Sequence, residues 1–537
     1  MAVRAAALPP WSVDPADGTD PPPALGDLFV APARRWPDRA AIDDGATGYT
    51  FAELEEGTLA VAAWLAGQGV GPGDRVVVLA EKRAVVPILA VAVWKRGAVY
   101  VPLDAAEPVA RLRGLLARLE PAVVIALDDR DDPVATTGRR LGGAELAGIL
   151  AGPPATHTTS AHPPGQAAYI IFASGPTGEP QGVENKAESL HAYFRAHNEV
   201  LRFTSASRVL SLAPFHVDVS FEDTLLPLSL GAFTFQFRNL PAGAVMRAVL
   251  GRERITHLIA VTMLLTMITG DGRQLTRAKL PDLELVMTGA QVCDPAVLDT
   301  WKRQLPDVRL LHAFGPPEAT VFSVSQEIGA ARTTPYPIGR PLRGLTATLV
   351  ADGVEITEPG VPGELQVGGE QVMLRYFDHP AETDRVLVER DGTRYFRTGD
   401  VCAYDEEGAL VFLRHGDEDV TWIAGRRTHL GEIRRVAQGC AGVDRAIAAR
   451  IRRDNRDVVA LVVVAADRRV LPEVEALLSV LPDYLRPTVI AWSHPTTADD
   501  GAVVERLADA ARRSPSRYFA LSADDAVEPI DKVEPCL

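Results

Sequence analysis

A glycine-rich loop that follows an apolar stretch is the first candidate for chemistry. Residues 169–183 read YIIFASGPTGEPQGV, so a strand-like run leads into a loop that contains Ser174 and Thr177. Backbone N–H groups and hydroxyls in such a loop can surround phosphate oxygens. Because a Gly/Pro loop after a strand is more often only a turn, this segment needs support from the rest of the chain.

Three more polar segments follow the loop at broad intervals. Residues 312–321 read HAFGPPEATV, residues 395–400 read YFRTGD, and residues 425–433 read GRRTHLGEI. The glycine-rich loop is therefore not an isolated feature. Whether the four segments can act together depends on the elements that position them.

The first part of the chain alternates between helical and strand-like patterns. Residues 51–68 place apolar side chains at helical spacing, and a turn at 69–74 leads into an apolar strand at 75–80. A second helix is expected at 88–94, with further strands at 99–103 and 122–127. This alternation predicts a layered α/β sheet.

The pattern changes after residue 350. Residues 351–413 contain short strand candidates separated by Gly, Asp and Pro turns, which predicts a β-rich region. Beyond it, helices are expected at 431–438 and 472–481, and an apolar strand is expected at 458–465. These elements predict a separate small domain that begins near Asp417.

The expected fold class is therefore α/β with two domains. The large N-terminal domain, residues 1–416, would consist of layered α/β sheets plus a β-rich subdomain, and residues 417–537 would form a small α+β domain. The Pro/Thr/Ser/His-rich stretch 153–165 is interpreted as a surface connection within the large domain.

Composition and charge argue against several classes of protein. The 537 residues contain 55 Lys and Arg against 70 Asp and Glu, and the formal net charge of −15 argues against a nucleic-acid partner. Four widely spaced cysteines without C-x-x-C spacing suggest neither a disulfide framework nor a zinc site. Lys95 and Arg96 interrupt the longest apolar stretch, and no export signal is visible, so we expect a cytoplasmic protein without a membrane partner.

In this order, the four polar segments resemble motifs of adenylate-forming enzymes, specifically the adenylation domains of nonribosomal peptide synthetases. Those domains carry Y-T-S-G-S-T-G-x-P-K-G-V, Y-G-P-T-E, Y-R-T-G-D and R-G-x-R-I-E-L-G-E-I. The resemblance extends to 49–54 (YTFAEL), 94–104 (WKRGAVYVPLD) and 481–487 (LPDYLRP), and it covers roughly residues 25–507. It implies that the small C-terminal domain is a mobile lid, which rotates between adenylation and thioester-forming states.

The resemblance implies roles in binding ATP and Mg²⁺. Glu318 matches the catalytic glutamate that binds magnesium, a hard cation that prefers carboxylate oxygens. Asp400 matches the aspartate that accepts both ribose hydroxyls, and Phe314, followed by Gly315, matches the aromatic that stacks on adenine. Asp417 matches the hinge aspartate after a one-residue insertion, and an acidic loop residue without that role is the alternative. The loop residues expected to contact the nucleotide are Ser174, Gly175, Thr177 and Gly178.

The resemblance also implies a substrate pocket. Residues 218–232 align without gaps with the family stretch whose aspartate pairs with the substrate's α-ammonium, so Asp218 implies an amino-acid substrate. Glu222 stands out because a carboxylate in an apolar pocket is costly unless it meets a cation or is protonated. A diamino acid would supply that cation; alternatively, Glu222 turns to solvent or to a nearby arginine. The other aligned positions are mostly apolar: Val219, Ile259, Met287, Gly289, Ala313, Val321 and Phe322.

The chain departs from the family pattern where the family contacts phosphates or closes its lid over them. The family's catalytic lysine lies in P-L-T-x-N-G-K-V-D-R, and alignment on Gly501 places Ala502 at that position. Arg506 is a candidate substitute for this lysine. The family's glycine-rich loop also carries a lysine, which is Gln181 here, and Lys186 is a candidate substitute for that one. Each charge-assisted contact of this kind is worth about 1.5–3 kcal/mol. The remaining departures are Pro176, Pro317 and Ala424.

The leading interpretation is a stand-alone enzyme of secondary metabolism that uses ATP to convert an amino acid to its aminoacyl-AMP. It would then transfer the aminoacyl group to the thiol of a separate carrier protein, because the acidic tail after residue 513 is short. The missing lysine leaves two alternatives open. One is a non-catalytic paralogue that binds a nucleotide or a partner, and the other is a ligase of the same fold with altered chemistry.

Overall fold

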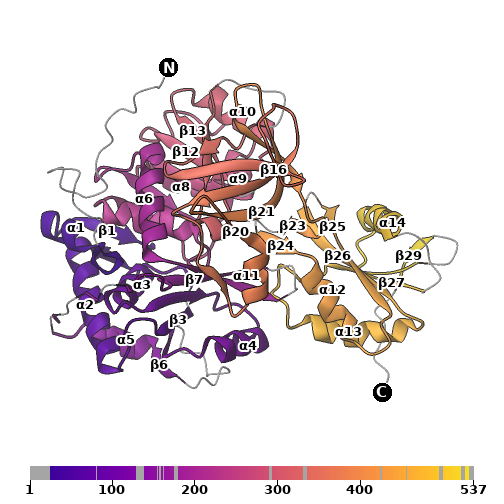
Figure 1. Cartoon of the computed structure of the whole chain (residues 1–537), viewed down its shortest axis with the longest axis horizontal. Helices are drawn as coiled ribbons and strands as arrows, with labels where there is room; N and C mark the ends of the chain where they lie inside the picture. The colour runs from indigo at the N-terminus through magenta and orange to yellow at the C-terminus, as the bar shows by residue number, and fades with distance from the viewer. Residues whose placement is uncertain are drawn as a thin grey trace. The chain divides into compact units, whose positions relative to one another are not determined.

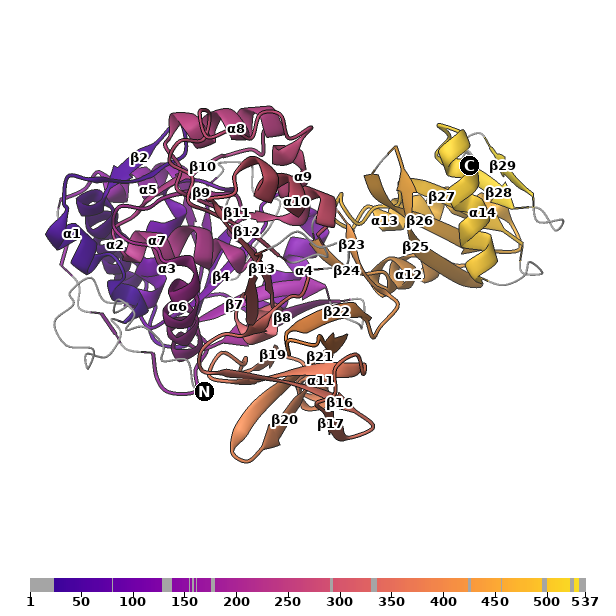
Figure 2. The ribbon, with the colours of Figure 1, turned by 90° about the horizontal axis from the view of Figure 1, so that it is seen from above.

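The chain divides into two compact units, which Figures 1 and 2 show from two directions. The smaller unit contains Asp417–Leu537 together with the short segments Ala106–Leu115 and Ala173–Gln181, and the larger unit contains the rest. The computed structural model describes residues 24–79, 81–127, 138–153, 155–156, 159–160, 162–174, 179–289, 293–329, 336–423, 426–454, 456–494, 500–521 and 526–530.

A nine-stranded sheet in the larger unit carries much of the candidate site. Its strand order is β15 (Arg340–Pro341), β14 (Val324–Glu327), β13 (Arg309–Phe314), β12 (Leu285–Gly289), β11 (His257–Val261), β9 (Arg208–Ser211), β10 (Phe233–Gln236), β1 (Ala40–Asp43) and β2 (Gly48–Thr50). Strands β9 to β13 pair in parallel. They are mostly apolar because both faces of a parallel sheet are covered. One face packs on α8 (Gly243–Arg252), α9 (Thr262–Thr269) and α10 (Pro295–Gln304).

A second sheet has seven strands. The order is β19 (Arg375–Phe377), β8 (Pro180–Asn185), β7 (Tyr169–Ser174), β4 (Val99–Leu103), β3 (Arg75–Leu79), β5 (Val123–Ala126) and β6 (Arg139–Gly142). The helices of the N-terminal part are α1 (Val30–Arg35), α2 (Phe51–Gly67), α3 (Val86–Lys95), α4 (Val109–Leu119), α5 (Gly143–Leu150), α6 (Ala187–Leu201) and α7 (Leu226–Ser229), with the short turn η1 (Leu25–Asp27).

Helix α2 shows how the local sequence fixes these elements. The Thr50 hydroxyl accepts a hydrogen bond from the Glu53 backbone N–H, and the Glu53 carboxylate accepts one from the Thr50 N–H. This capping box satisfies two backbone donors at the start of the helix. The apolar side chains of α2 then pack on α3, which is buried along its whole length.

The β-rich part of the larger unit is an antiparallel sheet. It contains β17 (Val354–Ile356), β16 (Leu345–Ala351), β18 (Gly363–Gly369), β21 (Thr393–Tyr404) and β20 (Leu387–Arg390), with β22 (Leu410–His415) paired to β21. Helix α11 (Pro380–Val386) contacts β19, β20 and β21 (Figure 2).

The smaller unit has its own sheets and core. Strands β23 (Val420–Ile423) and β24 (Arg426–His429) form a hairpin, and a five-stranded sheet follows in the order β25 (Arg445–Arg453), β26 (Arg456–Val464), β27 (Val489–Ser493), β28 (Tyr518–Leu521) and β29 (Val527–Pro529). One buried cluster includes side chains of α12 (Gly431–Gln438) and α13 (Leu471–Leu478), which follows the turn η4 (Arg468–Val470). A second cluster includes apolar side chains of α14 (Asp500–Arg513).

The expected α/β fold class is confirmed: layered sheets, a β-rich subdomain and a small α+β unit are all present. The strand expected at 99–103 and the helix expected at 431–438 have the predicted bounds, whereas the helix expected at 472–481 ends at Leu478. The described residues of 153–165 form neither helix nor strand.

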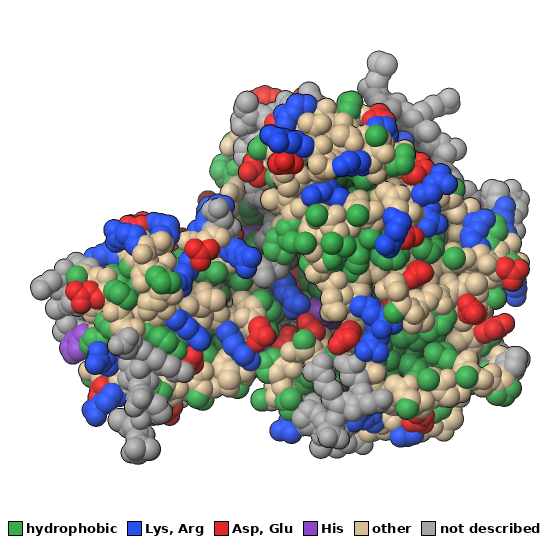
Figure 3. Space-filling view, turned by 180° about the vertical axis from the view of Figure 1, so that it is seen from behind, with side chains coloured by type: hydrophobic (Ala, Val, Ile, Leu, Met, Phe, Trp, Pro, Cys, Tyr) green, Lys and Arg blue, Asp and Glu red, His purple; other side chains and the backbone are tan. Residues whose placement is uncertain are grey.

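Acidic and basic side chains are interspersed over the face shown in Figure 3. Many of the described arginines form ion pairs with nearby carboxylates, as Arg309 does with Glu327 and Arg397 with Glu364. Among the described helices, none has both the length and the apolar character that crossing a membrane requires.

Candidate active site

Asp218 is a buried carboxylate just before the π-helical turn η2 (Phe221–Leu225). Its residue is 7% exposed, and its Oδ2 atom has no hydrogen-bond partner among the described residues. Burial raises the pKa of Asp218 to about 7, and the negative charge of Glu318 acts in the same direction. A bound cation would remove both penalties, as expected for a group that pairs with an ammonium.

Glu318 lies on the short turn η3 (Pro317–Ala319) and is 5% exposed. The hydroxyl of Tyr376, on β19, donates a 2.7 Å hydrogen bond to Glu318 Oε1. The Oε2 atom is buried without a partner among the described residues, so one carboxylate oxygen is left for a ligand. A hard cation such as Mg²⁺ fits this oxygen ligand. The hydrogen bond from Tyr376 to Oε1 fixes the orientation of the Glu318 carboxylate.

Asp400 and Phe314 lie in a group with two further residues that the sequence patterns did not single out. His415 Nδ1 lies 2.6 Å from Asp400 Oδ1, and the two residues are opposite each other across β21 and β22. The ring of Phe412 lies 5.0 Å from that of His415 and 6.2 Å from that of Phe314. An aromatic surface next to a carboxylate suits a nucleoside, because the base can stack while the ribose hydroxyls donate to the acid.

The two residues of this group that the sequence patterns missed, Phe412 and His415, both lie on β22. A register irregularity between Val401 and Cys402 interrupts the pairing of β21 with β22, so that Asp400 pairs with His415 and Cys402 with Phe412. Simple alternation would place positions 412 and 415 on opposite faces, whereas such an irregularity re-aims side chains. Sequence alternation alone therefore gives no signal for His415.

The apolar positions of the predicted substrate pocket lie close together. Ile259 and Met287 are neighbours across β11 and β12, and Gly289 is opposite Ala313 across β12 and β13. A Cβ atom at Gly289 would lie 2.4 Å from the Ala313 carbonyl oxygen and 2.8 Å from the Phe322 ring, so only glycine fits. Val219, Val321 and Phe322 belong to the same packed core as Ile259, Met287 and Ala313.

Gly315 has a similar requirement. A Cβ atom there would approach the Phe322 Cα atom to 2.4 Å. The chain next to the aromatic Phe314 therefore packs directly on a residue of the predicted substrate pocket. The structure thus places one predicted nucleotide residue, Gly315, against one predicted substrate residue, Phe322.

Glu222 is fully buried on η2, so it does not turn to solvent, and no arginine in the described part of the chain pairs with it. Its Oε2 atom accepts a hydrogen bond from the Tyr193 hydroxyl and lies 2.5 Å from His197 Nδ1. Burial raises the pKa of Glu222 well above its usual value and lowers the pKa of His197 to about 3. Tyr193 and His197 are one helical turn apart on α6, and no motif identified them in the sequence.

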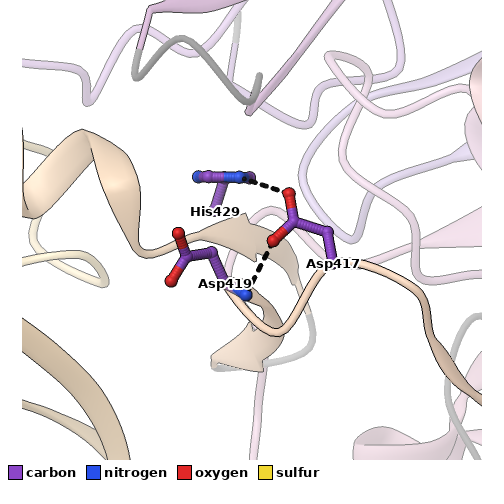
Figure 4. A group of neighbouring side chains, drawn as sticks. All are labelled: Asp417, Asp419 and His429. Atoms are coloured by element: carbon purple, nitrogen blue, oxygen red, sulfur yellow. Dashed lines mark hydrogen bonds and ion pairs between the residues drawn. The ribbon is translucent and has the colours of Figure 1, made fainter. Parts of the chain in front are cut away.

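Asp417 lies in the smaller unit at the start of its first hairpin, and its side chain is about half exposed. Figure 4 shows that its carboxylate faces His429, with Oδ2 3.0 Å from His429 Nε2, while Oδ1 accepts the Asp419 N–H at 2.9 Å. Asp419 also pairs with Arg434 through both carboxylate oxygens. At the predicted hinge, the Asp417 carboxylate is therefore bonded to the His429 ring and to the backbone N–H of Asp419.

The phosphate-facing predictions fall largely outside the described part of the structure. Residues 175–178, which include Gly175, Pro176, Thr177 and Gly178, and Ala424 are not described, and for Ser174 only the backbone is. Gln181 is buried, and Pro317 begins η3, where its carbonyl oxygen accepts a hydrogen bond from Asn185. Ala502 lies in the first turn of α14, and Lys186 immediately precedes α6.

Two α/β sheets, an antiparallel β-rich subdomain and a small α+β unit make up the fold, and the family match identifies an AMP-binding, adenylate-forming enzyme. The chain belongs to the AMP-binding enzyme family, whose match covers residues 29–377.

Relatives of the chain include nonribosomal peptide synthetases. The chain is 30% identical to the probable non-canonical nonribosomal peptide synthetase CymA of Salinispora arenicola over 79% of this chain and 5% of CymA. It is 31% identical to the phenyloxazoline synthase MbtB of Mycolicibacterium paratuberculosis over 88% of this chain and 41% of MbtB. The chain thus spans less than half the length of these relatives. It spans 78% of the dapdiamide synthesis protein DdaD of Enterobacter agglomerans, with 30% identity over 87% of this chain.

Solved structures share the fold. An artificially fused adenylation–PCP di-domain, NpsA-ThdA from Klebsiella oxytoca, matches with a TM-score of 0.77 and 20% identity over 87% of this chain and 93% of that one. The holo structure of PA1221, a protein containing adenylation and PCP domains, matches this chain with a TM-score of 0.79 and 22% identity over 90% of this chain and 84% of PA1221.

Proposed function

We propose that this protein activates an amino acid by adenylation. A substrate carboxylate oxygen would bond to the α-phosphorus of ATP while the bond to pyrophosphate breaks, giving the aminoacyl-AMP and pyrophosphate. The observation that carries the substrate class is Asp218, a buried carboxylate whose Oδ2 atom has no partner among the described residues. An α-ammonium would neutralise it and hold the substrate in one orientation.

The nucleotide end of the proposed site consists of Phe314, Phe412, His415 and Asp400. Adenine would stack on the aromatic side chains, and the ribose hydroxyls would donate hydrogen bonds to Asp400. His415, within 2.6 Å of Asp400 Oδ1, holds that carboxylate in place. These contacts would position the α-phosphorus for attack rather than take part in bond making.

Glu318 would hold a Mg²⁺ ion through its buried Oε2 atom, while Tyr376 donates to Oε1. Such an ion neutralises charge on phosphate oxygens. The fit rests on the orphaned, buried carboxylate oxygen and on the preference of this ion for oxygen ligands.

We further propose that the aminoacyl group is transferred to the thiol of a separate carrier protein. Two structural relatives contain adenylation and PCP domains, which supports this partner. In that scheme residues 417–537 form the lid, and Asp417 is its hinge. The hydrogen bond that Asp417 accepts from the Asp419 N–H, and the one between its carboxylate and His429, would be made or broken as the hinge turns.

For the substrate side chain, we propose a second amine that pairs with Glu222. A fully buried carboxylate on η2 supports this assignment, because a cation would offset the cost of its ionisation.

One observation favours a second candidate function, a non-catalytic paralogue or a ligase with altered chemistry. Ala502 occupies the position aligned with the catalytic lysine, and the sequence has no lysine between Asp417 and Asp531. The ammonium that would stabilise developing phosphate charge is therefore missing from that position.

The test is ATP–pyrophosphate exchange over a panel of amino acids, with calorimetry of ATP and amino-acid binding alongside. Adenylation predicts exchange with one group of amino acids. Binding without exchange supports the second candidate, and preference for benzoates or fatty acids over every amino acid contradicts the substrate assignment.

A further inference from the structure

Glu222, His197 and Tyr193 form a closed polar cluster between α6 and η2. All three side chains are fully buried, and the Tyr193 oxygen lies 2.7 Å from His197 Nδ1. Both the tyrosine hydroxyl and the histidine ring are bonded to the same carboxylate atom, Glu222 Oε2. One carboxylate oxygen, Oε2, thus has two partners, and the other oxygen, Oε1, has none among the described residues.

Two atoms of the cluster have no partner among the described residues: Glu222 Oε1 and His197 Nε2, both buried. Leaving two such atoms unpaired is costly in a folded protein, because each has lost its hydrogen bonds to water without a replacement. The His197 ring also lies 5.8 Å from the ring of Phe322, whose edge approaches Gly289. The cluster therefore adjoins the predicted substrate pocket.

The protonation state of the cluster decides what the two open atoms can bind. When the Glu222 carboxyl is protonated and donates to Nδ1, Oε1 is an acceptor and Nε2–H is a donor, so the cluster is neutral. When the cluster has lost one proton, so that Glu222 is an anion and the neutral imidazole carries its hydrogen at Nδ1 and not at Nε2, both open atoms are acceptors. The second arrangement matches a primary ammonium, which has several donors and the opposite charge.

We propose that His197, supported by Tyr193, is a specificity-determining residue, and that a second amine on the substrate amino acid binds to both Glu222 Oε1 and His197 Nε2. This inference rests on the proposed function, which supplies the amino-acid substrate and its anchor, Asp218. It adds that α6 contributes directly to side-chain selection.

Burial supports a change of protonation on binding. It raises the pKa of Glu222 and lowers the pKa of His197, so the neutral arrangement is favoured before substrate enters. The other titratable groups near Glu222 are Tyr193 on α6 and Asp223 on η2, whose negative charge further raises the pKa of Glu222. Asp223 is itself fixed by hydrogen bonds from Ser211 and two backbone N–H groups. On the side of the cluster that faces the predicted pocket, the neighbour of His197 is the uncharged ring of Phe322.

The experiment measures binding of matched amino acids to the full-length protein by calorimetry. The pairs are 2,3-diaminopropionate with 2-aminobutyrate, 2,4-diaminobutyrate with norvaline, and ornithine with norleucine, which differ by an amine in place of a methyl group. In the wild type, one diamino acid should bind at least tenfold more tightly than its partner. His197→Phe should reduce this ratio about tenfold while leaving the affinity for the neutral partner within about threefold.

Two more variants separate selection from packing. His197→Gln keeps a polar atom near the Nε2 position and should restore part of the ratio, and Tyr193→Phe, which removes only a hydroxyl, should lower it less than His197→Phe does. His257→Phe is the matched control, because it also removes a buried histidine, which bonds to the Leu201 carbonyl. In His257→Phe, the ratio of diamino-acid affinity to neutral-partner affinity should equal that of the wild type.

Proton release gives a second readout, obtained from binding enthalpies in buffers of different ionisation enthalpy. The preferred diamino acid should release up to one proton more than its neutral partner, and Glu222→Gln should abolish the difference. If His197→Phe misfolds, Tyr193→Phe and this readout still decide the matter. A wild type that binds neutral amino acids equally well or better overturns the inference alone, whereas a wild type that binds ATP but no amino acid overturns the proposed function first.

Discussion

The substrate side and the phosphate side of the candidate site differ in the charged groups that they retain. The proposed substrate and ribose positions keep Asp218 and Asp400, and the proposed magnesium ligand Glu318 is kept as well; all three are buried in the larger unit. The phosphate side has Gln181 and Ala502 at the two positions aligned with family lysines. Binding and bond making therefore place separate demands on this fold, and a chain can satisfy the first while weakening the second.

The largest effect is expected on the side that is intact. Asp218→Ala should lower amino-acid affinity at least a hundredfold, because removing one partner of a buried ion pair costs about 3–5 kcal/mol. ATP affinity should stay within about threefold. Calorimetry with each ligand measures both, and Asp218→Asn, which keeps the shape but not the charge, is the control. An unchanged amino-acid affinity in both variants would remove Asp218 from the site.

The next largest effect is expected on the depleted side. Ala502→Lys restores an ammonium at the position aligned with the family's catalytic lysine, and electrostatic stabilisation of this kind is worth about 2.7–4 kcal/mol in a preorganised site. Pyrophosphate exchange should then rise about a hundredfold or more. Ala502→Gln, which adds length without charge, should give no such gain.

The wild-type rate decides how the lysine result is interpreted. Exchange at rates normal for the family, with no gain from Ala502→Lys, would mean that another cation has taken over. Arg506→Ala and Lys186→Ala would then identify it by a loss of exchange. Inactivity of both wild type and Ala502→Lys would favour the non-catalytic or altered-reaction alternatives.

A smaller effect is expected at the ribose end. Asp400→Ala should weaken ATP binding by about 1.5–3 kcal/mol, the range for hydrogen bonds to a charged group. Calorimetry with ATP measures the change, and amino-acid binding serves as the internal control. A wild type that binds no ATP would leave only the non-catalytic alternative.

The smallest expected effect is a pH dependence. Burial raises the pKa of Asp218 to about 7, and only the ionised form pairs with an ammonium. Affinity for a neutral amino acid, measured without Mg²⁺, should therefore fall about tenfold per pH unit below the pKa and level off above it. A dependence of opposite sign between pH 5.5 and 7.5 would contradict the pairing.

The parts of the fold that depend on local pattern were predictable. Residues 99–103 form an uninterrupted apolar run and are a buried strand, and the spacing of apolar residues in 51–68 marks α2, whose capping box begins at Thr50. Such signals lie within a few residues of one another. They need no knowledge of tertiary contacts.

The parts of the site that depend on distant contacts were not predictable from the sequence pattern. Glu222 is an acid in an apolar segment, but its partners Tyr193 and His197 lie 29 and 25 residues away on another helix. His415 reaches Asp400 through a register irregularity between two strands, which alternation does not reveal. The contacts of Glu222 and of Asp400 both arise from tertiary packing, which the spacing of residues in the sequence does not reveal.

In the proposed substrate pocket, Gly289 limits how the substrate range can change by mutation. A larger residue there would meet the Ala313 carbonyl oxygen at 2.4 Å, and a backbone atom of a paired strand cannot rotate away. Mutational routes to a new substrate are therefore closed at this position. They stay open at Val219 and Ile259, whose side chains can be exchanged for others of similar volume. Natural variation and directed evolution should both record substitutions at those two positions and retain glycine at 289.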